Sequence, residues 1–163
     1  VNQDFWAAPV LSRFGQRNAR GLLHHSCSLK YLGVVLETAE KYEPAIEAYS
    51  DARQMFSETS GPDGLKSWLP LLSLGRTYIR ISDYDAAFDV LTDAQQGFAP
   101  LLPEGHFIFD IVTCLRGHAA HKLGASSNMD MLLSAATNLS KRPKRQSEYQ
   151  ICTETLNELQ DLE

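Results

Sequence analysis

Apolar side chains recur along most of the chain at spacings of three and four residues, which is the spacing of one face of an α-helix. This helical pattern itself repeats every 42 residues. The positions that share the period are Gly33, Gly75 and Gly117; Phe14, Phe56 and Phe98; Val10, Ala52, Ala94 and Ala136; Ala7, Tyr49, Leu91 and Leu133; and Ala45, Ala87 and Met129. Several sets with one period and one phase indicate an array of repeated structural units.

Each unit predicts two helices joined by a short turn. In the first unit one apolar face extends over residues 29–39, and Pro44 opens the next helix, where the missing N–H of proline costs nothing. A segment rich in glycine and proline, residues 60–64, ends the unit. The second unit repeats these features and closes over residues 100–105, and the third extends over residues 107–140. Glycines and alanines stand where two helix backbones must approach closely.

The two ends of the sequence depart from the repeat. Residues 4–16 carry the apolar marks of a second helix alone, so we expect the chain to begin inside a longer array. Residues 147–162 predict an amphipathic helix that does not match the repeat, and we expect either a capping helix or a diverged next repeat. The apolar face of this last helix carries Tyr149, Cys152, Leu156 and Leu159.

The order of residues within each unit resembles the tetratricopeptide repeat. The first unit carries Leu32-Gly33, Tyr42, Ala45, Tyr49 and Ala52 in the order typical of that family, and the second carries Leu74-Gly75, Tyr78, Tyr84, Ala87, Leu91 and Ala94. The third unit departs from the pattern at Arg116, Ser126 and Met129. A period of 42 is longer than the common period of about 34 and is similar to the kinesin-light-chain type of repeat.

This resemblance implies an all-α fold, a right-handed α-solenoid of helix-turn-helix repeats. We expect residues 1–20 to form the second helix of a truncated preceding repeat, and residues 21–64 and 65–105 to form two repeats. Residues 106–140 would form a diverged repeat, and residues 141–163 a basic linker followed by a C-terminal capping helix.

The resemblance also implies where a partner binds, because the first helices of such repeats line a concave groove. Positions counted from the repeat glycine carry the groove side chains over to this sequence. The first unit then presents Cys27, Lys30, Val34, Glu37 and Thr38; the second presents Leu69, Leu72, Arg76, Ile79 and Arg80; and the third presents Ile111, Cys114, His118, His121 and Lys122.

The charge of this groove set is opposite to that of the chain. The set holds four lysines and arginines and one glutamate, a net charge of +3, whereas the whole chain has 15 Lys and Arg, 20 Asp and Glu, and a net charge of -5. A concave surface of one sign attracts the opposite charge. Because apolar side chains lie among these cations, we predict a protein-interaction module, a scaffold or adaptor, that binds a peptide segment with acidic and hydrophobic residues.

The sequence argues against a nucleic-acid or membrane partner and leaves one alternative function. The negative net charge argues against a nucleic-acid partner, and no apolar stretch approaches the ~20 residues of a membrane span. The alternative function is a ligand- or peptide-sensing regulatory domain of a larger signalling or transcription protein. The sequence leaves the oligomeric state open.

The sequence offers one arrangement for chemistry. Cys114, His118 and His121 share a helical face, and such spacing can hold zinc or form a Cys–His nucleophile. No acidic fourth ligand lies nearby in sequence, so we expect no enzyme, no metal and no cofactor. Three widely spaced cysteines indicate neither a disulfide framework nor a CxxC zinc site, and a cytoplasmic protein is the expectation. The basic run at 141–145 is either a nuclear import signal or a solvated linker.

Overall fold

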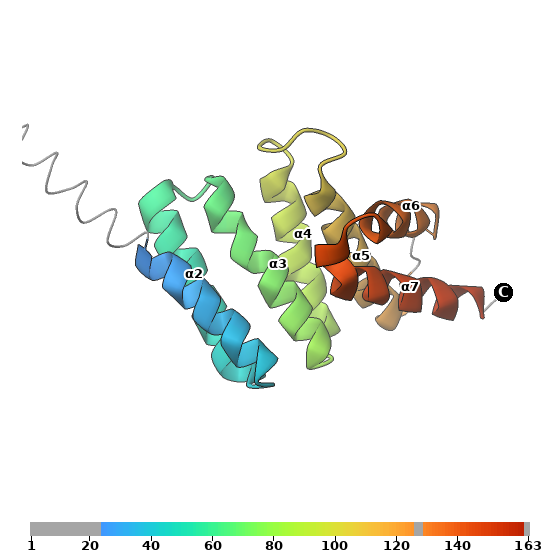
Figure 1. Cartoon of the computed structure of the whole chain (residues 1–163), viewed down its shortest axis with the longest axis horizontal. Helices are drawn as coiled ribbons and strands as arrows, with labels where there is room; N and C mark the ends of the chain where they lie inside the picture. Colours follow the sequence, from blue (N-terminus) through green and yellow to red (C-terminus); the bar gives the residue numbers. More distant parts are fainter. Residues whose placement is uncertain (1–23, 126–128, 162–163) are drawn as a thin grey trace, which may run out of the picture. The chain divides into compact units, whose positions relative to one another are not determined.

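The computed structural model describes residues 24–125 and 129–161, and these residues are almost entirely helical (Figure 1). A first helix covers residues 24–38. It is followed by α2 (Tyr42–Ser60), α3 (Leu65–Arg80), α4 (Tyr84–Phe98), α5 (Phe107–Lys122), α6 (Met129–Ser140), the short 3-10 helix η2 (Pro143–Arg145) and α7 (Gln146–Gln160). These ranges contain no β-strand, so the predicted all-α class of paired helices is confirmed. The helix expected over residues 4–16 lies outside the described residues.

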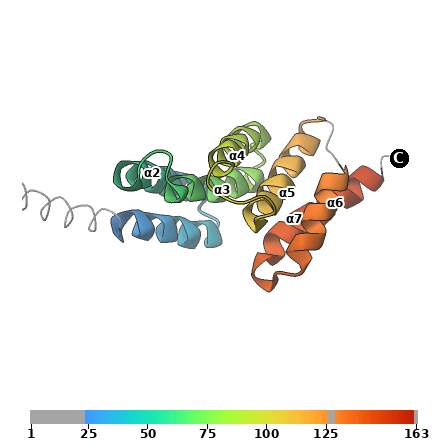
Figure 2. The same ribbon diagram turned by 90° about the horizontal axis from the view of Figure 1, so that it is seen from above.

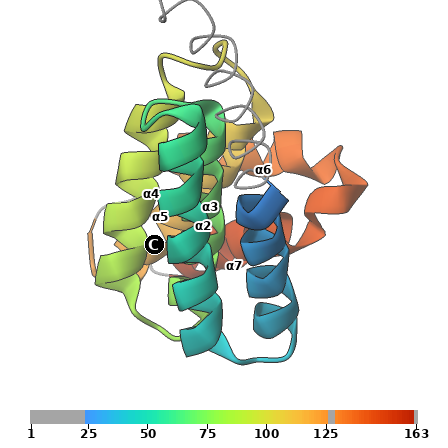
Figure 3. The same ribbon diagram turned by 90° about the vertical axis from the view of Figure 1, so that its left-hand side faces the viewer.

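The chain divides into two compact units, residues 1–67 and residues 68–163. In the first unit, helix 24–38 runs beside α2 (Figure 3). A Cβ on Gly33 would lie 2.5 Å from the ring of Tyr49, so this helix pair needs a glycine at its closest approach. Tyr49 is fully buried, and its hydroxyl donates a 2.9 Å hydrogen bond to Oε2 of Glu37.

In the second unit each helix packs on the next one along the chain. A Cβ on Gly75 of α3 would lie 2.5 Å from the side chain of Leu91 in α4, which repeats the contact seen in the first unit. Figure 2 shows α5 between α4 and α6, and α7 packs on both α5 and α6. The buried core of this unit includes Leu91, Leu115 and Leu132.

The first helix of each pair ends in the same turn. Glu40, Ser82 and Gly124 lie 42 residues apart, and each adopts a positive φ, at 58°, 62° and 76°. In each turn the following residue donates its N–H to a carbonyl five residues back, as Asp83 does to Tyr78 at 3.0 Å. This is the Schellman ending of a helix, which favours glycine at its left-handed position. The 42-residue period is therefore present in the backbone as well as in the core.

The second helix of the third pair departs from the period. The sequence puts Leu133 opposite Gly117, but a Cβ on Gly117 would lie 2.6 Å from Leu132. Leu132 is 1% exposed and Leu133 is 56% exposed. The same shift buries Ala135 and Leu139 in α6. Leu133 keeps the 42-residue period in the sequence but lies at the surface, because this helix pair is one residue shorter between its glycine and the facing side chain.

Candidate interaction surface

One face of α7 lies on predicted groove positions of α3 and α5, which both belong to the compact unit of residues 68–163. Figure 1 shows α7 crossing α5, on which it packs. The α7 residues that meet groove positions are four, three and three residues apart, so they share one helical face. From the start of the helix to its end they are Glu148, Cys152, Thr155 and Glu158.

The first of these contacts is a buried ion pair between α7 and α3. Nη1 of Arg76 lies 3.5 Å from Oε1 of Glu148, whose side chain is 4% exposed. Arg145 approaches the same oxygen at 3.4 Å, and the hydroxyl of Ser147 donates to Oε2 at 2.8 Å. A buried carboxylate is tolerated only with such partners, so the guanidinium of Arg76 helps to hold the start of α7 in place.

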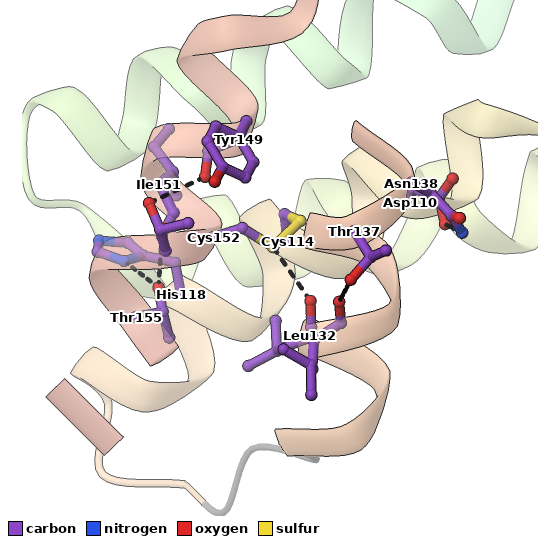
Figure 4. Close-up of a disulfide and its surroundings, with 12 residues drawn as sticks. Asp110, Cys114, His118, Leu132, Thr137, Asn138, Tyr149, Ile151, Cys152 and Thr155 are labelled. Carbon is purple, nitrogen blue, oxygen red and sulfur yellow. Dashed lines mark hydrogen bonds between the residues drawn. A yellow bond between two sulfur atoms is a disulfide. The ribbon is translucent and has the colours of Figure 1, made fainter. Parts of the chain in front are cut away.

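The second contact is covalent. Cys114 of α5 and Cys152 of α7 form a disulfide between Cα atoms 4.9 Å apart, and both residues are fully buried (Figure 4). The expectation that the cysteines form no disulfide is therefore wrong. The two cysteines are 38 residues apart in sequence, and only the packing of α7 on α5 brings them together. This disulfide also removes the cysteine argument for a reducing, cytoplasmic compartment.

The third contact is a hydrogen bond between buried side chains. Nδ1 of His118 lies 2.8 Å from Oγ1 of Thr155, and the Thr155 hydroxyl donates to the Ile151 carbonyl at 2.8 Å (Figure 4). When the single proton of that hydroxyl is donated to Ile151, Nδ1 of His118 is the donor to Thr155. Burial lowers the pKa of His118 below its ordinary value, and the nearby charge of Lys122 lowers it further. Both effects disfavour the charged form of the imidazole.

The fourth contact joins the ends of α5 and α7 at the surface. Nζ of Lys122 donates to both carboxylate oxygens of Glu158 at 2.7 Å, and Nε2 of His121 lies 3.0 Å from Oε2. The hydrogen bond from Lys122 lowers the pKa of Glu158. The side chains of Lys122 and Glu158 are 30% and 41% exposed, so solvent screens this pair and its contribution to stability is small.

The remaining groove positions of the second unit divide between core and surface. Ile79 and Ile111 are buried in the hydrophobic cluster that includes Leu156 of α7, and Leu72 packs against that cluster. Leu69 is half-buried and Arg80 is exposed. An open groove at Ile79, Ile111, Cys114 and His118 is thus a wrong expectation, because these four side chains are buried. Whether the set binds a partner stays a prediction.

In the first unit the predicted positions behave differently. Lys30 and Cys27 are half-buried, and Val34 and Thr38 are exposed. Glu37 is buried and accepts the hydrogen bond from Tyr49, so the expectation that it faces a partner is wrong. The sequence interpretation missed Tyr31 and Val35, which are both 64% exposed and give helix 24–38 a second apolar face. The run of apolar residues from 31 to 36 is the signal that could have revealed it.

The basic run that follows α6 is partly packed on α5. The guanidinium groups of Arg142 and Arg145 lie 4.8 and 5.4 Å from the ring centre of Phe107. These cation–π contacts fix the linker that leads into α7. A targeting role for the run stays a prediction.

The zinc alternative fits the structure poorly. The disulfide takes up the thiol of Cys114, and His118 is hydrogen-bonded to Thr155. Within residues 24–125 and 129–161, no three His, Cys, Asp or Glu side chains are grouped so that they could hold a metal ion.

The tetratricopeptide repeat family matches residues 25–98 of this chain. Residues 25–98 are tetratricopeptide repeats. The match includes both pairs in which the period of 42 holds, and it ends at the last residue of α4. Tetratricopeptide repeats mediate protein–protein interactions, whereas the kinesin-light-chain subtype stays a prediction. No curated protein matches the chain. Among the described helices, none combines the length and the apolar character that crossing a membrane requires.

Proposed function

We propose that this chain is a non-catalytic interaction module. The surface formed by α3 and α5, on which α7 lies, would bind an amphipathic segment with acidic residues. The observation that carries the proposal is the chemistry of α7. Cations on α3 and α5, Arg76 and Lys122, each pair with a glutamate of α7, and apolar side chains of α7 pack between the two ion pairs. The surface thus accepts a helix with carboxylates at both ends and an apolar centre.

The arrangement also accounts for the charge of the surface. The chain carries a net charge of -5, so an acidic partner is repelled by most of its surface and attracted only where cations gather. Arg80 is exposed on the last turn of α3, one helical turn after Arg76. We infer that Arg80 extends the cationic strip to which acidic residues of a partner are drawn.

The experiment is a titration of the full chain, under reducing conditions, with three fluorescent helical peptides. The peptides share one apolar face and carry acidic, neutral or basic residues on its two flanks. We expect the acidic peptide to bind at least about ten-fold more tightly than the basic one, and the difference to shrink between about 50 and 300 mM salt. Equal affinities for the three peptides, or no binding of any, would overturn the proposal.

A pair of charge-reversal variants localises the binding. Arg80→Glu lies on the proposed surface, whereas Lys41→Glu makes the same change in net charge at an exposed position just before α2. We expect Arg80→Glu to weaken the acidic peptide about ten-fold, and Lys41→Glu to leave its affinity within about two-fold. An equal loss in both variants would show a non-specific effect of net charge and contradict the proposed surface.

A further inference from the structure

We propose that α7 is a removable occupant of this surface, and that the Cys114–Cys152 disulfide is the latch that keeps it in place. The inference rests on the proposed function, since the surface that α7 covers is the one that would receive the acidic segment of a partner. In the disulfide-bonded chain α7 covers the surface. In the reduced chain a partner helix can compete with α7 for the same surface.

The first argument is that α7 contacts the surface in the manner expected of a ligand. Four of its polar or covalent contacts, those of Glu148, Cys152, Thr155 and Glu158, are made to positions that the resemblance assigns to partner binding. α7 also carries the predicted partner chemistry, with Glu148 and Glu158 on either side of Leu156. Ion pairs at both ends of α7 give the surface a preference for acidic helices.

The second argument is that α7 depends on the surface for its order. Its N-cap residue, Arg145, makes no side-chain cap hydrogen bond, and the helix has 15 residues. An isolated helix of this length is only marginally stable in water, so its packing on α5 and α6 must stabilise it. A segment of this kind can leave its site by unfolding locally.

The third argument concerns the position of the disulfide. Cys152 lies near the middle of α7, between the two ion pairs. A disulfide keeps its two Cα atoms within about 7 Å of each other, so an intact bond prevents the centre of α7 from leaving α5. Because both cysteines are fully buried, a reductant reaches the sulfurs only when the turns of α7 on either side of Cys152 open locally, while the bond still tethers its centre.

A dithiol reductant can reduce this disulfide by two successive thiol–disulfide exchanges. One of its thiolates attacks a protein sulfur, which breaks the protein disulfide, forms a mixed disulfide and releases one protein thiolate. The second thiolate of the reductant then displaces the other protein sulfur. The products are two protein cysteines, which take up protons from solvent, and a reductant that has been oxidised to its own disulfide.

The reduced chain retains a place for α7. Sγ of Cys152 lies 3.6 Å from the Leu132 carbonyl oxygen (Figure 4), and a thiol at this position can donate a weak hydrogen bond to it. Reduction therefore frees α7 to exchange without forcing it off the surface. Opening is then an equilibrium that a competing partner can shift.

Amide hydrogen exchange on the full chain tests the latch. A Cys27→Ser background removes the cysteine outside the disulfide, and exchange is compared with and without a dithiol reductant. We expect reduction to speed exchange over residues 146–160 by at least about ten-fold, while α5 stays protected. The variant Cys152→Ser should reproduce this result without reductant, with circular dichroism as the folding control.

Two outcomes of that experiment would overturn the latch. Unchanged exchange in α7 after reduction would show that non-covalent contacts alone hold the helix. Equal loss of protection in α5 and α7 would show that the disulfide staples the whole unit. Should the serine variant fail to fold, the reduced Cys27→Ser chain provides the same comparison.

Disulfide trapping separates this inference from the proposed function. A peptide with the sequence of residues 146–160 is incubated, in a glutathione redox buffer, with the full chain carrying Cys27→Ser and Cys152→Ser. We expect its cysteine to cross-link to Cys114 about ten-fold faster than that of a control peptide with Glu148→Gln and Glu158→Gln. Equal rates for the two peptides, together with faster exchange of α7, would refute the acidic preference and leave the latch standing.

Discussion

Arg76 of α3 and Glu148 of α7 lie 72 positions apart in the sequence, yet their side chains form an ion pair. Nη1 of Arg76 lies 3.5 Å from Oε1 of Glu148, and this carboxylate is almost fully buried. The repeat pattern assigns Arg76 to the recognition of an external partner. In the structure it recognises the last helix of its own chain. Cys114, His118 and Lys122 also contact α7, so α7 meets, within one molecule, four positions that we predicted for a partner.

The Arg76 contact leads to a prediction about stability. Arg76→Ala removes one partner from a buried carboxylate, so we expect the free energy of unfolding to fall by about 1–3 kcal/mol in urea denaturation. The exposed Lys144 of the neighbouring turn provides the control, and Lys144→Ala should change stability by less than about 0.5 kcal/mol. Equal stability of the two variants would mean that the ion pair contributes nothing.

A second prediction tests the register of α6. Leu132→Ala leaves a cavity in the core and should cost about 2–4 kcal/mol of unfolding free energy. Leu133→Ala truncates a side chain that is 56% exposed and should cost less than about 1 kcal/mol. Urea denaturation of both variants measures the difference. The reverse order would restore the 42-residue register in this helix and contradict the structure.

A third prediction concerns the turns that end the first helices. Ser82 adopts a left-handed conformation that glycine tolerates at lower cost, so Ser82→Gly should raise the free energy of unfolding by about 0.5–1 kcal/mol. At the equivalent position of the next pair the native residue is glycine, and Gly124→Ala should lower stability by about 1 kcal/mol. Thermal denaturation checks both signs, and a loss of stability in Ser82→Gly would refute the turn assignment.

A fourth prediction is a dependence of stability on pH. The pKa of His118 is lowered in the folded chain, so the unfolded chain binds a proton at this residue more readily. The free energy of unfolding should therefore fall as pH decreases through the ordinary histidine pKa of about 6.5, and the loss continues down to the lower pKa of the folded state.

The groups that face His118 define the control for this experiment. Lys122 and His121 lower its pKa, Glu158 raises it, and Thr155 accepts its proton in the hydrogen bond. His118→Asn keeps a donor without a group that titrates, so its stability should fall less than that of the parent between about pH 7.5 and pH 5.5. Urea denaturation at both values gives the comparison, and identical pH profiles would exclude His118 as the cause.

The first two helix pairs could be predicted because each depends on contacts that recur at a fixed interval. Gly33 and Gly75 both face a large side chain 16 residues later, and the sequence shows both members of each contact. The third pair breaks this rule by one residue, and the one-residue slip turns Leu132 rather than Leu133 toward the core. A period read from glycines alone cannot reveal a shorter connection after the glycine.

The sequence could locate the residues that form the candidate surface, but it could not show that α7 of the same chain covers them. The glycine frame located Arg76, Cys114, His118 and Lys122 on one face, and all four do contact a helix that carries carboxylates. That the helix belongs to the same chain depends on the path of α7 across α5, for which the repeat pattern contains no signal. The disulfide follows from the same path, so the spacing of the cysteines could not indicate it.

The disulfide offers the most direct test that α7 lies on the predicted groove positions. The chain is purified without reductant, its free thiols are blocked, and its proteolytic fragments are mapped by mass spectrometry without reduction. The structure predicts a fragment pair joined through Cys114 and Cys152, with Cys27 blocked as a free thiol. A linkage through Cys27, or three blocked cysteines in the folded chain, would contradict the placement of α7.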